Sequence, residues 1–169
     1  IIVNGTLTMQ AYPTYYTGAR GYLSTGVSAG KIFYLYIEST GTVNLREFLP
    51  NGTGGNGDPG FVEIMAGGVL NVANVTDLRN TGNAIYGDGT FNVNNGATLR
   101  LRDPLGITAA PAAAGAIQTG VRNYSTGASY TYEAVLGSQV TGDGLPASVR
   151  YLTINNTNGV SLTNSVSVD

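Results

Sequence analysis

The sequence lacks the residues on which many enzyme sites depend. Its 169 residues include no Cys, no His and no Trp. A zinc site of Cys and His, a haem ligated by either residue, an iron–sulfur cluster held by Cys and a His-based catalytic triad are therefore excluded. Without Cys there is also no disulfide framework. The composition predicts a protein with no catalytic residues and no cofactor.

Charge is scarce as well. Charged residues make up 11% of the chain, against about 25% in an ordinary globular domain, and the formal net charge is -2. Lys and Arg together number 8 and are scattered, so a surface that follows nucleic-acid phosphates is not expected. The longest strongly apolar run, residues 32–37, is far shorter than the ~20 residues of a membrane-spanning helix. The sequence therefore predicts neither a nucleic-acid partner nor a membrane span.

The residues that are abundant favour strands and turns. The chain has 25 Gly, 20 Thr, 16 Asn and 10 Ser, together with 11 Tyr, 4 Phe and 42% hydrophobic residues. The low net charge and the aromatic content argue against disorder. Thr, Val, Ile and Tyr favour strands, whereas Gly and Asn favour turns. An all-β domain of short strands joined by tight turns is predicted.

The strand-like segments recur at intervals. Many of them share one local pattern. A turn that contains Gly is followed by a small or polar residue and then by apolar residues at every second position. Val43 and Leu70 are 27 residues apart, Leu70 and Phe91 are 21 apart, and Tyr130 and Leu152 are 22 apart. The alternating segments are residues 3–9, 31–38, 42–48, 68–72, 89–93, 97–102, 129–132, 151–154, 160–163 and 166–168.

A quasi-repeat of 20–27 residues without helical periodicity is typical of a solenoid. We expect a right-handed parallel β-helix, in which short strands of each coil stack on those of the next. The alternative is a β-sandwich of eight to ten strands, which uses the same local signals. Residues 1–169 are interpreted as one β-solenoid segment, and the strand-like pattern at both ends indicates a fragment of a longer repetitive chain.

Two segments interrupt the pattern. Residues 51–60 (NGTGGNGDPG) are predicted to form a turn-rich loop. Residues 104–120 are rich in Ala and contain two prolines. This second segment is predicted to form either a short helical turn or a covering loop.

Several motifs resemble those of enzymes but lack their context. Residues 26–30 match GxSxG, and Ser28 with Lys31 matches SxxK. The first motif needs a His as its base, and the chain has none. The second needs a helix to bring Ser28 close to Lys31, but Gly30 lies between them and a strand is expected to follow. Residues 52–57 match GxGxxG, but residues 58–60 (DPG) replace the helix of a dinucleotide site. All three are interpreted as turns.

A cation site is left open. Residues 54–58 (GGNGD) are one residue short of the calcium-binding GGxGxD repeat, and that repeat occurs in several stacked copies. Carbonyl-rich turns suit calcium. A loop without a metal is the favoured interpretation, since the chain has one imperfect copy, and Asp58, Asp88 and Asp143 are the alternative ligands for a cation such as calcium.

Aromatic and charged side chains also cluster. The tyrosines Tyr34 and Tyr36, like Tyr12, Tyr15 and Tyr16, could stack on sugar rings, but the favoured interpretation is that they cover one end of the apolar core.

Arg100 and Arg102 alternate with an apolar residue and precede Asp103 directly. Their spacing of two places both arginines on one face of a strand. An exposed charged stripe is favoured over an anion site.

The second half of the chain repeats one style of short segment. These segments are residues 87–91 (GDGTF), 95–99 (NGATL), 104–107 (PLGI), 115–120 (GAIQTG), 125–132 (STGASYTY), 139–146 (QVTGDGLP), 152–156 (LTINN) and 159–163 (GVSLT). This style resembles the repeat region of very large secreted and surface proteins of Bacteroidota that are exported by the type IX system and described as adhesin-like. The likeness covers residues 85–168 well and residues 1–84 loosely. It implies an extracellular or cell-surface stalk rich in β-structure, with no catalytic residues to carry over.

Two functions follow as expectations. The first is a non-enzymatic structural segment of an extracellular adhesin, stalk or filament, with further copies of the chain, adjoining repeats or surface glycans as partners. The alternative is a carbohydrate-binding or polysaccharide-degrading β-helix module. It would need a groove lined by aromatic and charged residues, for instance Tyr34, Tyr36, Arg46 and Glu47.

Overall fold

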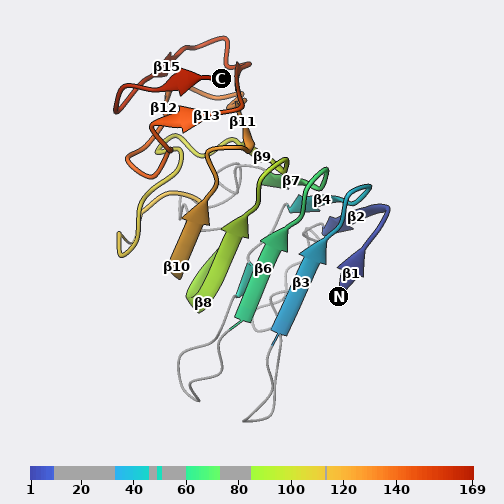
Figure 1. The fold of residues 1–169 in the computed structure, drawn as a ribbon. Coiled ribbons are helices and arrows are strands. Elements are labelled where there is room, and N and C mark those ends of the chain that lie inside the picture. Colours follow the sequence, from blue (N-terminus) through green and yellow to red (C-terminus); the bar gives the residue numbers. More distant parts are fainter. Residues whose placement is uncertain (10–32, 46–48, 51–59, 73–84, 113) are drawn as a thin grey trace.

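The protein is a stack of parallel β-strands, as a computed structural model shows (Figure 1). The structure describes residues 1–9, 33–45, 49–50, 60–72, 85–112 and 114–169. These residues contain strands and turns but no helix. The all-β prediction is therefore confirmed for the described part of the chain.

Two six-stranded sheets form the body of the molecule. In Figure 1, sheet A faces the viewer and sheet B lies behind it. Sheet A contains, in spatial order, β1 (Ile2–Val3), β3 (Phe33–Ile37), β6 (Gly60–Ile64), β8 (Ile85–Val93) and β10 (Ile117–Tyr124), with β5 (Leu49–Pro50) also paired to β8. Sheet B contains β14 (Tyr151–Ile154), β11 (Ser129–Tyr132), β9 (Thr98–Leu101), β7 (Val69–Val72), β4 (Thr42–Leu45) and β2 (Thr6–Met9).

Two small sheets complete the fold near the C-terminus. They lie together beyond the tip of β10 in Figure 1. The chain thus visits sheet A and then sheet B in each coil, and in its last part it visits sheet B and the two small sheets. One small sheet pairs β12 (Gln139–Val140) with β15 (Val160–Ser161), and the other pairs β13 (Ser148–Val149) with β16 (Ser167–Val168).

The core lies between the inner faces of the two large sheets. The strands of sheet B alternate half-buried and buried residues, because successive side chains of a strand point to opposite faces. Each inner side chain stacks on its equivalent in the next coil, and these rows are fully buried. Sheet A contributes Leu35, Val62 and Phe91, and sheet B contributes Val43, Leu70, Leu99 and Tyr130.

Tight turns join the two sheets at one corner and stack on one another. In each of four coils an N–H donates to the carbonyl three residues earlier, from Gly41, Gly68, Ala97 and Ala128. A side chain at Gly41 would lie 2.0 Å from the carbonyl oxygen of Val3, and one at Gly68 would lie 2.4 Å from that of Ile37. These two glycines are therefore required by the close approach of neighbouring coils. The stacked turns explain the Gly-containing pattern before β4, β7, β9 and β11.

The register tests the predicted repeat. Val43 pairs with Leu70, and Tyr130 pairs with Leu152, as the spacings of 27 and 22 residues predict. The spacing between Leu70 and Phe91 was misleading, because Phe91 lies in sheet A and pairs with Val62. Leu70 instead pairs with Leu99. Two strands of similar sequence from different sheets produced the false interval.

All described strand pairs are parallel. This arrangement is that of a solenoid, whereas the β-sandwich alternative uses antiparallel pairs. Within residues 104–120 the described part forms turns and no helix, and Ile117 already begins β10. The helical alternative for that segment is therefore wrong. Residues 51–59 of the predicted loop lie outside the described residues, and Gly60 is the first residue of β6.

Candidate functional site

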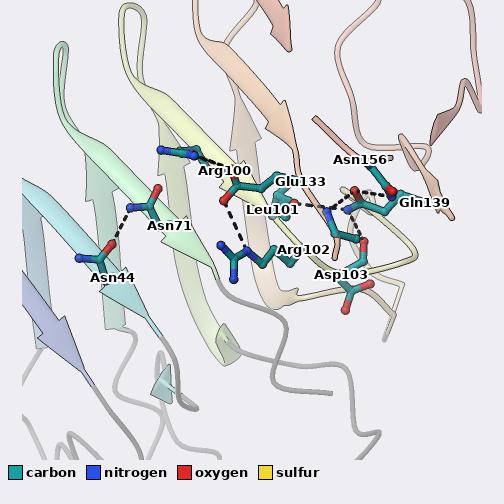
Figure 2. Close-up of polar contacts among 10 residues, drawn as sticks. Asn44, Asn71, Arg100, Leu101, Arg102, Asp103, Glu133, Gln139 and Asn156 are labelled. Atoms are coloured by element: carbon teal, nitrogen blue, oxygen red, sulfur yellow. Dashed lines mark hydrogen bonds and ion pairs between the residues drawn. The ribbon is translucent and has the colours of Figure 1, made fainter. Parts of the chain in front are cut away.

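The outer face of sheet B carries a ladder of polar side chains. Thr8, Asn44, Asn71 and Arg100 occupy equivalent positions in successive coils. Asn71 Nδ2 donates to Asn44 Oδ1 at 2.6 Å, and Asn44 Nδ2 donates to Thr8 Oγ1 at 3.3 Å. Figure 2 shows the two amides aligned across their strands. Such a ladder binds neighbouring coils to each other on the solvent side.

The ladder ends in a cluster of three charges. Glu133 Oε2 accepts hydrogen bonds from Nε and Nη2 of Arg100, and its Oε1 lies 3.5 Å from Arg102 Nε. Both arginine side chains are 41% exposed, whereas that of Glu133 is 9% exposed. The predicted common face of Arg100 and Arg102 is confirmed (Figure 2). Sequence reasoning missed Glu133, because its approach depends on the register between β9 and β11.

Asp103 does not belong to this stripe. It is 3% exposed, and its Oδ1 accepts the N–H of Leu105 at 2.8 Å. Burial raises the pKa of the Asp103 carboxyl, and the hydrogen bond from Leu105 opposes this shift. The exposed stripe therefore ends at Arg102. Because successive side chains of an extended segment point to opposite faces, Asp103 points away from the face that carries Arg102.

Beside Asp103, two buried amides hold the corner between coils (Figure 2). Gln139 Nε2 donates to the carbonyl oxygen of Asp103 at 2.9 Å, and Gln139 Oε1 accepts the N–H of Ala134 at 2.8 Å. Asn156 Nδ2 lies 3.3 Å from the same Oε1 and 3.1 Å from the carbonyl oxygen of Gly137. These bonds satisfy polar groups that burial would otherwise leave unpaired, so their role is structural.

The outer face of sheet A is different, because it carries aromatic rings. The rings of Tyr34 and Phe61 stack with centroids 5.1 Å apart, and those of Tyr34 and Tyr36 with centroids 5.7 Å apart. The interplanar angles are 10° and 8°, so the three rings are nearly parallel. Tyr34 is 38% exposed. The prediction that these tyrosines cover the end of the core is wrong, because they lie on the outer face. We call Tyr34, Tyr36 and Phe61 the aromatic strip.

A polar row continues from the aromatic strip. Tyr36, Glu63, Asn92 and Asn123 occupy equivalent positions on β3, β6, β8 and β10. Asn123 Nδ2 donates to Asn92 Oδ1 at 2.8 Å, and Asn94 Nδ2 donates to Glu63 Oε1 at 2.8 Å. We call Glu63, Asn92, Asn94 and Asn123 the amide row. Its members are half-buried or exposed on the outer face of sheet A.

The amide row reaches a cleft at the end of β10. Arg122 and Tyr124 pair with the inner residues Phe91 and Val93, so they line this cleft from the inner side of the strand. The cleft has a volume of about 690 Å³ and is open to solvent on one side. Asn94 and Asn123 belong both to the amide row and to its lining. The lining consists of Val93, Asn94, Asn95, Ala109, Ala110, Arg122, Asn123, Tyr124, Ser125, Asp143, Gly144 and Pro146.

Two side chains of the cleft are unusual. Arg122 donates to carbonyl oxygens of the alanine-rich loop, with Nη2 2.6 Å from that of Ala112 and Nη1 3.0 Å from that of Thr108. The hydroxyl of Tyr124 is buried and has no hydrogen-bond partner within the described part of the chain. Burial raises the pKa of Tyr124, so its hydroxyl stays protonated and able to donate. Sequence reasoning identified neither residue, since both depend on the fold of residues 104–116.

The candidate cation ligands do not converge. Asp88 is exposed within β8, and Asp143 is exposed in a turn where its Oδ1 accepts the N–H of Ala109 at 2.9 Å. Within the described ranges, no three Asp or Glu residues lie close enough to hold a metal ion. Asp58 lies outside the described residues.

Several sequence candidates also fall outside the described residues. Arg46 and Glu47, which were expected to line a groove with Tyr34 and Tyr36, are among them. The others are Tyr12, Tyr15, Tyr16, Ser28, Lys31 and residues 52–57. Of the expected groove, only the two tyrosines are placed, and they lie side by side.

No family model, curated protein or solved structure matches this chain. In the part of the chain that the structure describes, no helix is long and apolar enough to cross a membrane. The fold and the geometry of the described residues are therefore the basis for a functional interpretation.

Proposed function

We propose that the chain is a non-enzymatic structural segment of an extracellular or cell-surface adhesin, stalk or filament. In this proposal its coils form a right-handed parallel β-helix, since parallel crossover connections are right-handed in nearly all proteins. The likeness of its repeats to those of Bacteroidota surface proteins supports the setting. The structure supports the mechanical role through its continuous parallel ladders and fully buried inner rows.

The observation that carries the proposal is the exposure of the last coil. Leu152 and Ile154 of β14 continue the inner rows of Tyr130 and Tyr132 in register. Tyr130 and Tyr132 are fully buried, but Ile154 is 48% exposed. Among the described strands, β14 pairs with β11 alone and thus presents a free edge. A further coil placed on β14 would bury these side chains and pair this edge, as each preceding coil does.

Light scattering tests this role. The isolated chain should assemble end to end as its concentration rises, because the exposed edge of β14 offers both apolar rows and backbone groups. Ile154→Lys should reduce assembly, since a charge would enter the row. Leu105→Lys is the matched control, because Leu105 is 51% exposed in a turn and belongs to no strand. A monodisperse, fully folded monomer across the concentration range would refute the proposal.

A further inference from the structure

We infer that the outer face of sheet A binds a neutral oligosaccharide, from the aromatic strip across the amide row into the cleft at β10. The inference goes beyond the structural role and does not depend on it. The proposed surface lies on the side of the solenoid, whereas stacking of coils takes place at β14. Three separate features of the described residues lead to it.

The aromatic strip supplies the apolar part of such a site. Sugar rings present C–H faces that pack on aromatic side chains, whose polar tips stay in water. Tyr34, Tyr36 and Phe61 hold nearly parallel rings on an exposed sheet face, and two of them carry hydroxyls. Their mutual stacking fixes the orientation of the rings before any ligand arrives, so little side-chain freedom would be lost on binding.

The amide row supplies paired donors and acceptors. Each amide side chain has two N–H donors and an acceptor oxygen, which complements hydroxyl groups that both donate and accept. The bond from Asn123 to Asn92 uses one donor and one acceptor, and leaves other hydrogen-bonding positions of both groups available. Neighbouring strands are about 4.8 Å apart, so the row from Tyr36 to Asn123 spans roughly 14 Å. An extended sugar chain can lie along it.

The cleft supplies an enclosed end. Its volume of about 690 Å³ lies within the range of small-ligand pockets. Tyr124 lines the cleft from the inner side of β10, beside Phe91, and its buried hydroxyl has no partner among the described residues. A buried polar group without a partner is costly. A sugar hydroxyl entering the cleft would give this group its missing partner.

The charges around the surface favour a neutral ligand. Glu63 lies in the amide row, and Asp143 lines the cleft, so an acidic sugar chain would meet two carboxylates. Of the described residues that line the cleft, Arg122 alone is basic. Its guanidinium is already engaged by carbonyl oxygens of residues 108, 109, 112 and 119. It is therefore poorly placed to receive a carboxylate.

Calorimetric titration of the intact chain tests the inference with four defined hexasaccharides. Three are neutral (cellohexaose, xylohexaose and mannohexaose), and one is acidic (hexagalacturonate). We expect at least one neutral hexasaccharide to bind with Kd below about 1 mM, and the acidic one not to bind. Asn92→Ala and Tyr36→Ala should each weaken binding about tenfold, through loss of hydrogen bonds or of ring contact. Asn44→Ala is the matched control, since it removes a similar amide from the outer face of sheet B.

A second variant separates the cleft from the strip. Tyr124→Phe removes only the buried hydroxyl, so the fold should be preserved, while binding should weaken about threefold or more. Circular dichroism and urea unfolding confirm that each variant is folded before titration. The inference fails if no neutral hexasaccharide binds, if hexagalacturonate binds equally well, or if the sheet A variants bind as the unmodified chain does. End-to-end assembly, measured separately, is expected to be unchanged in every sheet A variant.

Discussion

The two large sheets have similar inner faces and different outer faces. Inside, both present fully buried aliphatic and aromatic rows. Outside, sheet B carries amides and a charge cluster that bond to one another, so most of its polar groups are used within the protein. Sheet A carries the aromatic strip and the amide row, and it leads to a cleft with an unpaired hydroxyl. The inner faces therefore maintain the fold, while the polar groups of one outer face mostly bond to one another and the other outer face retains capacity to bind.

The largest expected effect tests the equivalence of the inner faces. Leu99 in sheet B and Leu35 in sheet A are both fully buried. Leu99→Ala and Leu35→Ala should each lower the free energy of unfolding by about 2–5 kcal/mol, because each leaves a cavity in a packed row. Urea unfolding measures both. A loss below about 1 kcal/mol in one sheet only would show that its inner face is not part of the common core.

Much of this core could be predicted from the sequence, whereas the outer faces could not. Alternation at period two identifies which residues of a strand share a face, and so it indicated the inner residues Val43 and Leu70 correctly. It does not tell which sheet a strand joins, which is why Phe91 was placed in the wrong row. The contact of Arg100 with Glu133 depends on which residues of neighbouring coils lie side by side. Because the coils differ in length, this register cannot be read from the spacing of residues in the sequence.

The next effect concerns the charge cluster of sheet B. Glu133→Ala removes the carboxylate that both Arg100 and Arg102 contact. The free energy of unfolding should fall by about 1–2 kcal/mol, a value limited by the solvent exposure of the two arginines. Glu63→Ala in sheet A should cost less, about 0.5 kcal/mol, since one neutral amide contacts that carboxylate. Equal losses would remove the distinction between the two outer faces.

A smaller effect concerns Asp103 at the end of sheet B. Burial raises its pKa above the ordinary value near 3.8. The folded state therefore binds this proton more tightly than the unfolded state, and the associated stability is present below pH 3.8 and lost as pH rises through the folded-state pKa. Asp103→Asn should be more stable than the unmodified chain at pH 7, by less than the loss in Glu133→Ala. Its amide oxygen can still accept the N–H of Leu105.

Thermal unfolding between pH 3 and pH 7 measures this difference. The advantage of Asp103→Asn should shrink as the pH falls, since the native carboxyl then becomes neutral as well. Asp143→Asn is the control, because Asp143 is exposed in its turn. An advantage of Asp103→Asn that is independent of pH would contradict a role for the buried charge.

The smallest effect comes from within the amide ladder of sheet B. Asn71 Nδ2 donates to Asn44, but the Oδ1 of Asn71 is buried and has no partner. Asn71→Ala loses one hydrogen bond and also removes the unpaired oxygen, so its net cost should be near zero. Asn44→Ala removes the partner of both Thr8 and Asn71 and should cost about 1 kcal/mol. Urea unfolding of the two variants side by side gives the difference. If Asn71→Ala is the more costly, its oxygen has a partner in solution, and sheet B is then as fully bonded along its whole outer face as it is at Glu133.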